Sequence, residues 1–451
     1  AVAICASALL GSALSAAFWL PVLQTTAVSP RLNLSLGRAS RFVLRPEHFI
    51  TLIWPGYFGD PETGNYWAQG NMWEPALYLG VPQLFLAVLG LLQRRRDTRV
   101  LYHALLAGVC FWLALGAQGG LYAVAYYAIP GMSAFHDPAR FCVPATLAIA
   151  CLASIGFEHA RRRLSVGTGA AIVVASVALT LLWSSRLTPV ISAKELTYRA
   201  RIAAIGSGHR VYSAMRQEHW DRYVSYADYG PGTGRYVHEL TDTVSPNIGM
   251  RYDIEECGGY EPVPLFHATQ LERLVRAAVT EKMPKVPQLV GMTDARILLI
   301  PLGFRYAQPP FLSMRSAGNR VYRLMYPHAR AWVVDYVRPV ANDARALAIL
   351  GNPGFDGAHE AIIHAPVKDM PQALSAARAE DSHRRVEVRR VPNGCVLRLV
   401  PAAANRFVVI SAAWMPGWKA WTDKRPARLL PCNVALMGVS VPPGVREVRL
   451  E

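Results

Sequence analysis

The sequence lacks the short motifs that mark most nucleotide-dependent and acyl-transfer enzymes. It contains no phosphate-binding P-loop, no dinucleotide-binding glycine fingerprint and no serine nucleophile elbow. Its seven cysteines include no C-x-x-C pair, and no cluster of residues has metal-ligand spacing. The sequence therefore predicts neither a metal site nor a redox dithiol, and it identifies no cofactor.

Charged residues are missing from five apolar runs near the start of the chain, and no later run is long enough to cross a bilayer. The five runs are 1–23, 76–92, 101–116, 141–157 and 166–183. A membrane-crossing helix needs roughly 20 mainly apolar residues. We therefore predict that residues 1–187 form an α-helical polytopic membrane bundle with about five spanning helices.

Arginines cluster in two of the short connections between these runs. Residues 94–96 and residues 161–163 are each three consecutive arginines. Because clustered positive charge near helix ends stays on the cytoplasmic side, loops 24–75 and 117–140 are predicted to lie outside. The last run then places residues 188–451 outside as well.

The remainder of the chain has the patterns of an extracytoplasmic domain in two regions. Residues 188–350 mix helical spacing with short buried strands, which indicates an α/β region. Residues 351–451 contain short, regularly spaced strands, which indicates an antiparallel β-sandwich. In this region Asn393-Gly394 separates two strand patterns, a strong signal of a β-hairpin.

Positive charge exceeds negative charge, with 47 Lys and Arg against 31 Asp and Glu, for a net charge of +16. Beside a membrane, such a surface suits anionic lipid headgroups or an anionic envelope polymer. Nucleic acid is not an expected partner of an extracytoplasmic domain. The alternative is that the excess reflects an arginine-rich composition without a specific ligand.

Loop 46–74 concentrates aromatic and acidic residues at the predicted outer interface. The aromatic candidates are Trp54, Tyr57, Trp67 and Trp73, and the acidic candidates are Asp60 and Glu74. One interpretation is an aromatic belt that anchors helices at headgroup level. The other is a saccharide site, in which the rings line the sugar and the carboxylates do acid–base work.

A second polar segment leads into the run that begins at residue 141. It contains His136, Asp137 and Arg140. Arg140 is suited to gripping a phosphate, with His136 and Asp137 paired beside it. The alternative is that Asp137 caps the following helix and the Arg140 side chain reaches toward the membrane surface.

Several short motifs occur in a characteristic order along the chain. They are Trp54-Pro55-Gly56-Tyr57-Phe58-Gly59, Tyr78-Leu79-Gly80, Pro130-Gly131, Pro138-Ala139-Arg140-Phe141, Gly259-Tyr260, Pro416-Gly417-Trp418-Lys419-Ala420 and Val441-Pro442-Pro443-Gly444. With these motifs the chain resembles the YfhO-like bacterial membrane proteins, which are of the GT-C glycosyltransferase type.

This resemblance implies transfer of a sugar from a polyprenyl-phosphate donor to an envelope glycan or polymer. The reaction would take place at the outer leaflet of the bacterial cytoplasmic (inner) membrane, among membrane lipids. Arg140, His136 and Arg45 would bind the donor phosphate. The four aromatic candidates of loop 46–74 would line the saccharide path.

The catalytic residue is not identified by this resemblance. In GT-C enzymes the catalytic acid usually lies in the first outer loop, and we expect that loop to precede Ala1, because the chain opens inside an apolar run. Within the chain, Asp60, Glu74 and Asp137 are the candidates for the acceptor side or for a divalent metal. The chain departs from the family at His136, where an arginine is usual.

Two other functions fit the same sequence. One is a non-catalytic, membrane-anchored protein that assembles the envelope or binds an anionic polymer. The other is a lipid or polymer transporter, although transporters usually carry polar residues within their helices, and these runs lack charge.

Overall fold

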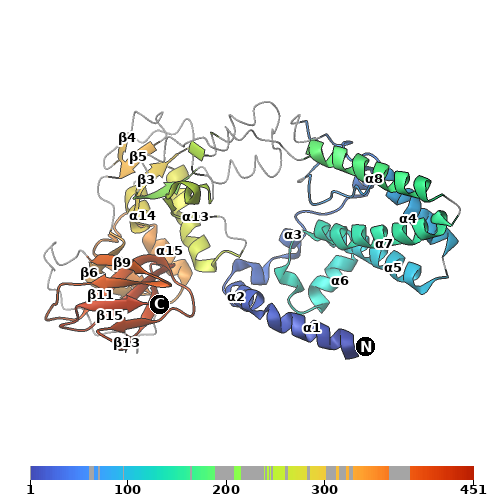
Figure 1. The fold of residues 1–451 in the computed structure, drawn as a ribbon. Helices are drawn as coiled ribbons and strands as arrows, with labels where there is room; N and C mark the ends of the chain where they lie inside the picture. The colour runs from blue at the N-terminus through green and yellow to red at the C-terminus, as the bar shows by residue number, and fades with distance from the viewer. Residues whose placement is uncertain are drawn as a thin grey trace. The chain divides into compact units, whose positions relative to one another are not determined.

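The computed structural model forms two compact units (Figure 1). The first, here called the helical unit, comprises residues 30–198 and 218–238, and the second, the sheet unit, comprises residues 1–29, 199–217 and 239–451. The described residues are 2–59, 65–69, 72–94, 96–162, 165–187, 208–214, 238, 241–242, 244, 247–259, 263–281, 285–300, 311–313, 321–324, 329–364 and 386–451.

Apolar helices form the helical unit. Its α-helices are α3 (Leu36–Ala39), α4 (Val81–Gln93), α5 (Thr98–Ala114), α6 (Leu121–Ala128), α7 (Cys142–Arg161) and α8 (Val166–Leu187). Short 3₁₀ helices connect them: η1 (Pro30–Asn33), η2 (Pro46–Leu52), η3 (Gly116–Gly119), η4 (Met132–Ala134) and η5 (Pro138–Phe141). Helix α7 packs against both α4 and α5, and small side chains such as Ala87, Ala107 and Ala153 fill the contact.

Two glycines allow α4 and α7 to approach closely. A Cβ atom on Gly156 would lie 1.8 Å from the carbonyl oxygen of Leu86, and one on Gly90 would lie 2.6 Å from that of Leu152. Small residues at such crossings let two helix backbones touch. Because Gly90 and Gly156 have no side chains, the backbones of α4 and α7 can come into contact at these two positions.

The prediction of a polytopic membrane bundle is wrong. In the described part of the chain, one helical stretch, Pro138–Arg161, is long and apolar enough to cross a membrane. A second candidate arises only if Cys5–Leu14 and Ala16–Ala27, which meet at a 70° bend, form one span. In addition, a large part of the chain forms three β-sheets.

Local breaks explain why the apolar runs do not become long helices. The first run divides at Ser15 into α1 (Val2–Leu14) and α2 (Ala16–Ala27). In the second run, Gly80 has φ 104°, and the helix begins only after it. At 1.5 Å per residue, the 13 residues of α4 extend only about 20 Å, against a hydrocarbon core of roughly 30 Å.

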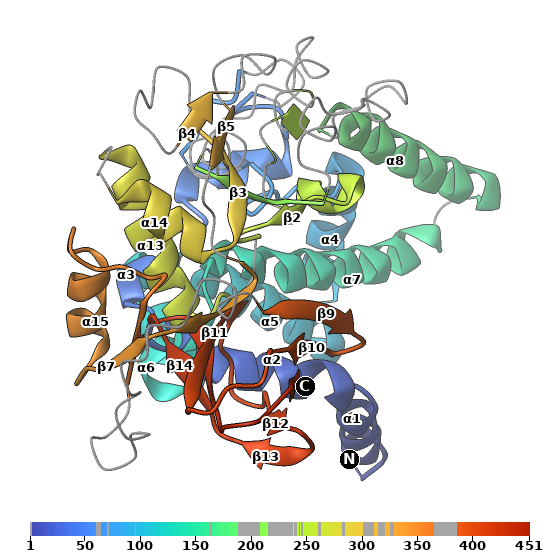
Figure 2. The ribbon, with the colours of Figure 1, turned by 90° about the vertical axis from the view of Figure 1, so that its left-hand side faces the viewer.

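The first sheet of the sheet unit is mixed. Its strand order is β2-β1-β3-β5-β4, from β1 (Arg210–Ser213), β2 (Glu255–Glu256), β3 (Ala295–Leu299), β4 (Phe311–Ser313) and β5 (Val321–Leu324). Strands β2, β1 and β3 are parallel, whereas β5 is antiparallel to both of its neighbours. Helices α13 (Phe266–Thr280) and α14 (Val286–Met292) lie beside β3 (Figure 2), and η6 (Ile248–Tyr252) precedes β2.

The other two sheets form a sandwich. One has the order β6-β11-β15-β14-β8-β7 and the other β13-β12-β16-β10-β9. The strands are β6 (Ala331–Val334), β7 (Tyr336–Pro339), β8 (Glu360–Ile363), β9 (Glu387–Val391), β10 (Gly394–Arg398), β11 (Arg406–Ala413), β12 (Ala420–Thr422), β13 (Arg425–Ala427), β14 (Leu429–Cys432), β15 (Leu436–Val441) and β16 (Glu447–Leu450). Their pairings are antiparallel apart from β7 with β8.

The side chains of β11 alternate between the two faces of the six-stranded sheet, and both faces are buried. Val408 and Ile410 point into the sandwich core, while Phe407 and Val409 join the core formed with α13, α14 and α15 (Asp343–Leu350). Because successive strand residues face opposite sides, an uninterrupted apolar strand is buried on both faces. Strands β6 and β7 precede residue 351, so this sheet draws on both regions distinguished in the sequence.

The hairpin at Asn393-Gly394 is confirmed. Strands β9 and β10 pair in register from Gly394 opposite Val391 to Arg398 opposite Glu387. Asn393 adopts the left-handed conformation with φ 62°, as expected of asparagine in a tight hairpin turn.

The contact between α4 and α7 provides a direct test of the helical unit. We expect Gly156→Ala to lower the free energy of unfolding by about 1–3 kcal/mol, because the added methyl group forces the helices apart. Denaturation followed by circular dichroism measures this. Gly108 in α5 has open space around its Cβ position, so Gly108→Ala is the matched control and should be neutral or stabilising by up to about 1 kcal/mol. Equal stability of the two variants would contradict the close packing.

Candidate functional site

Loop 46–78 of the helical unit folds around aromatic rings. Tyr57 lies at the centre, with its ring centroid 5.7 Å from that of Trp54, 5.0 Å from Phe58 and 5.8 Å from Trp67. These pairs are edge-on or tilted, the arrangements that aromatic rings favour. Trp54, Tyr57 and Trp67 are each exposed. The rings therefore form one cluster with an accessible side, defined here as the aromatic cluster.

An ion-pair network lies at the segment that enters α7. The Arg140 guanidinium contacts Glu74 Oε1 at 3.1 Å and Asp137 Oδ2 at 3.2 Å, and His136 Nδ1 also contacts Asp137 Oδ2. The side chains of Glu74 and Asp137 are 11% and 5% exposed, whereas that of Arg140 is 60% exposed. A single guanidinium at the surface thus pairs with two carboxylates beneath it and offsets part of their charge.

Asp137 is fixed by its backbone as well as by its side chain. Its N–H donates to the carbonyl oxygen of Ala39 over 2.9 Å, and Ala139 N–H donates to Phe42 O over 3.1 Å. Its φ of 65° lies in the left-handed region, where aspartate is one of the few tolerated residues. The carboxylate makes no capping bond to η5. The capping interpretation of Asp137 is therefore replaced by an ion pair with Arg140.

The structure brings some of the predicted site residues together and separates others. Glu74, His136, Asp137 and Arg140 share one network. Arg45 instead donates to Gln69 Oε1 over 2.5 Å and lies 3.9 Å from Glu47. Trp73 is exposed, and Asp60 lies outside the described residues.

The charge balance of this network bears on its chemistry. One arginine faces two carboxylates, so a phosphate that bound Arg140 would have to compete with both. The same arrangement suits a carboxylate that accepts a proton from a hydroxyl, because Glu74 and Asp137 are held in fixed positions beneath an exposed guanidinium.

His48 is a residue of this loop that the sequence analysis did not single out. It is 2% exposed and lines a small cavity with Pro55, Phe58 and Leu77. Burial lowers its pKa, so the ring is neutral at physiological pH. Its position in Pro46-Glu47-His48, at the start of a 3₁₀ helix, gave no signal because only the fold brings it to the cavity.

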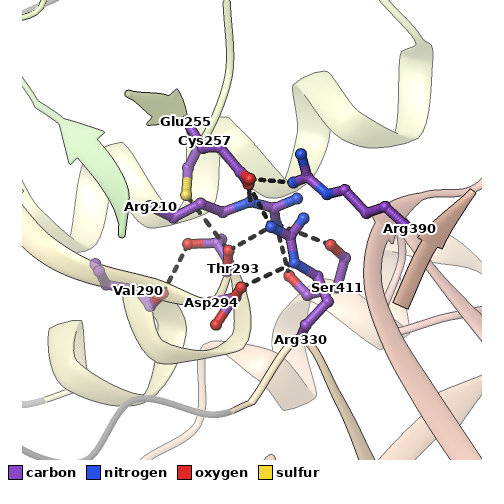
Figure 3. Close-up of polar contacts among 9 residues, drawn as sticks. All are labelled: Arg210, Glu255, Cys257, Val290, Thr293, Asp294, Arg330, Arg390 and Ser411. Atoms are coloured by element: carbon purple, nitrogen blue, oxygen red, sulfur yellow. Dashed lines mark hydrogen bonds and ion pairs between the residues drawn. The ribbon is translucent and has the colours of Figure 1, made fainter. Parts of the chain in front are cut away.

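A second polar cluster, here called the arginine cluster, lies in the sheet unit (Figure 3). Glu255 at the start of β2 receives contacts from Arg210 of β1, from Arg390 of β9 and from Arg330. Arg330 also contacts Asp294 Oδ2 at 3.0 Å. The cluster therefore ties the mixed sheet to both sheets of the sandwich.

Backbone groups complete the arginine cluster. Arg210 Nη1 donates to Thr293 O at 3.0 Å and to Ser411 O at 2.8 Å. Cys257 Sγ lies 3.4 Å from the same Thr293 oxygen, and burial raises the pKa of this thiol to about 11. The partly buried thiol is therefore protonated and a weak nucleophile. Because the contacts of the cluster join strands of different sheets, we assign it a structural role.

No group of three or more His, Cys, Asp or Glu side chains among the described residues has the geometry to hold a metal ion. Comparison of the chain with protein-family models, with curated proteins and with solved structures found no match in any of the three. The functional argument therefore depends on the geometry.

Removal of Arg140 tests the ion-pair network. We expect Arg140→Gln to lower the free energy of unfolding by roughly 1–2 kcal/mol, because two poorly exposed carboxylates lose their counter-charge. The loss is smaller than for a fully buried pair because solvent screens the exposed guanidinium. Arg162→Gln is the matched control, since Arg162 and Glu158 form an exposed pair 3.7 Å apart, and should change stability by less than about 0.5 kcal/mol. Denaturant titration of both variants gives the comparison, and equal losses would argue against the network.

Asp294 gives the arginine cluster a pH dependence. Burial raises its pKa to about 6, so the folded protein holds this proton more tightly than the unfolded chain, where an aspartate titrates near about 4. The contribution of Asp294 to stability is therefore present below about pH 4 and is lost as the pH rises through about 6. We expect Asp294→Asn to remove this decline from a series of unfolding measurements between about pH 4 and 7. Asp356→Asn, at an exposed aspartate, should retain it.

Proposed function

We propose that this chain transfers a sugar from a polyprenyl-phosphate donor to a hydroxyl of an envelope glycan or polymer, at the outer leaflet of a membrane. The observation that carries the proposal is the network in which Arg140 holds Glu74 and Asp137. A carboxylate held in a fixed position can accept the proton of an acceptor hydroxyl as a general base.

The chemical step follows from these groups. The acceptor hydroxyl oxygen attacks the anomeric carbon of the donor sugar, and the bond between that carbon and the phosphate oxygen breaks. The hydroxyl proton passes to Glu74 or Asp137, and the polyprenyl phosphate leaves with the electron pair. Arg140 stabilises the negative charge of the carboxylate that does not take the proton.

The aromatic cluster supports a saccharide as the substrate. The exposed rings of Trp54, Tyr57 and Trp67 belong to the same loop as Glu74, and they present apolar faces to solvent. Sugar rings carry apolar C–H faces that lie against aromatic rings. Loop 46–78 therefore offers a ring-binding surface and a carboxylate on one segment.

The apolar surface of the helical unit supports a lipid-linked donor. Several large side chains of α4, α5, α7 and α8 are each more than 60% exposed: Phe85, Leu92, Leu101, Leu105, Val143, Leu147, Val174, Leu181 and Leu182. Soluble proteins rarely expose apolar surface on this scale, whereas contact with lipid satisfies it. A polyprenyl chain in contact with these helices would cover part of this surface.

A second candidate function is favoured by the net charge of +16. A basic chain at a membrane surface could bind an anionic envelope polymer without catalysing a reaction. In that case the polymer would bind with strong salt dependence, and no sugar would be transferred.

A transfer assay separates these functions. The full chain in lipid vesicles is incubated with a polyprenyl-phosphate sugar carrying a labelled saccharide and with an envelope glycan acceptor. We expect transfer by the wild type, and a decrease of roughly 100-fold or more when the carboxylate that accepts the proton is neutralised, in Glu74→Gln or Asp137→Asn.

Arg162→Gln is the control for a lost surface charge and should transfer normally. Absence of transfer by the wild type, or normal transfer by both carboxylate variants, would refute the proposed reaction. Salt-sensitive binding of the polymer without transfer would instead support the second function.

A further inference from the structure

The hydrogen-bonding state of His48 is fixed by its neighbours. Its Nδ1 atom accepts the N–H of Arg45 over 3.0 Å. A neutral imidazole that accepts at Nδ1 carries its hydrogen on Nε2. His48 therefore presents an N–H donor at Nε2.

This donor has no hydrogen-bond partner within the described residues, although the side chain is buried. Leaving a buried donor unsatisfied costs about 1–3 kcal/mol, and native proteins rarely leave such a group unused. The Phe58 ring lies edge-on to the imidazole, with centroids 5.3 Å apart, which holds the imidazole in place.

The cavity beside His48 restricts what can satisfy the donor. Its volume is about 40 Å³, and one water needs roughly 10–15 Å³ on this scale. The walls are mainly apolar and include Pro55, Phe58 and Leu77, with Thr51 and Tyr66 as neighbouring hydroxyl groups. The described residues that line the cavity include no Lys or Arg, so a phosphate or carboxylate would enter beside them without a counter-charge, at a large cost in desolvation.

We propose that this cavity is a subsite for the hydroxymethyl group of a hexose, whose oxygen accepts the Nε2–H of His48. The group is small enough for the cavity, its carbon suits the apolar wall, and its oxygen is an uncharged acceptor. This inference rests on the proposed saccharide function and adds a specificity-determining residue to it. It separates recognition of the sugar, at His48, from the charged chemistry at Arg140.

The test uses three probes that differ only at this position. They are methyl glucopyranoside, its 6-deoxy derivative, which keeps the methyl group but lacks the hydroxyl, and methyl xylopyranoside, which lacks the whole group. Dissociation constants for the full chain are measured by ligand-observed NMR. We expect the glucoside to bind roughly tenfold more tightly than the 6-deoxy probe, the difference that one hydrogen bond confers.

Two substitutions at position 48 test the acceptor role of Nδ1 and the donor role of Nε2 separately. In His48→Asn the amide oxygen replaces Nδ1 as the acceptor for Arg45 N–H, while the donor at the Nε2 position is lost. In His48→Gln the amide nitrogen reaches the Nε2 position. We expect the Asn variant to bind the glucoside and the 6-deoxy probe equally, and the Gln variant to keep the preference. Thermal unfolding of both confirms that they fold.

The outcomes distinguish this subsite from the proposed function. A wild type that does not discriminate the three probes, or an Asn variant that still does, overturns the subsite and indicates a cavity filled by water alone. Discrimination by the wild type without any transfer activity leaves the subsite in place and refutes the transferase.

Discussion

Arg140 joins segments that are 66 residues apart in sequence, and the candidate site depends on this connection. Without its charge, Glu74 and Asp137 would be two carboxylates of like sign with little access to water, and the loop that carries Glu74 would be repelled from the entrance of α7. The aromatic cluster and the cavity at His48 are parts of that loop. The guanidinium is exposed while its partners are not, so the pairing can be reached by a ligand from the surface.

The sheet unit obtains its stability in a different way, from one sheet used on both faces. Strand β11 lies between β6 and β15, and its side chains alternate between the sandwich core and the core shared with α13, α14 and α15. Burial on both sides explains the apolar sequence Phe407–Ile410 at its centre. The arginine cluster then adds directional contacts between the mixed sheet and the sandwich to the apolar core that the two share.

Local patterns in the sequence predicted local structure, and interactions between distant residues decided the remainder. The hairpin at Asn393 follows from turn chemistry, so it could be predicted. The apolar runs became helices only in part, because Ser15 and Gly80 interrupt them. The mean hydropathy of a run does not register single residues that end a helix. His136, Asp137 and Arg140 were recognised as a group because they are neighbours, whereas the pairing with Glu74 and the orphan nitrogen of His48 exist only in the folded chain.

Strand β9 stands at the edge of its sheet, with β10 as its neighbour on the other side. Glu387, Arg389 and Arg390 on this strand are exposed, and charged side chains on an edge strand discourage pairing with the edge of another molecule. Arg390 serves this purpose while also contacting Glu255. The charge of Arg390 does not depend on its contact with Glu255, so a change that removed the Glu255 carboxylate would still leave a charged side chain at this edge of the sheet.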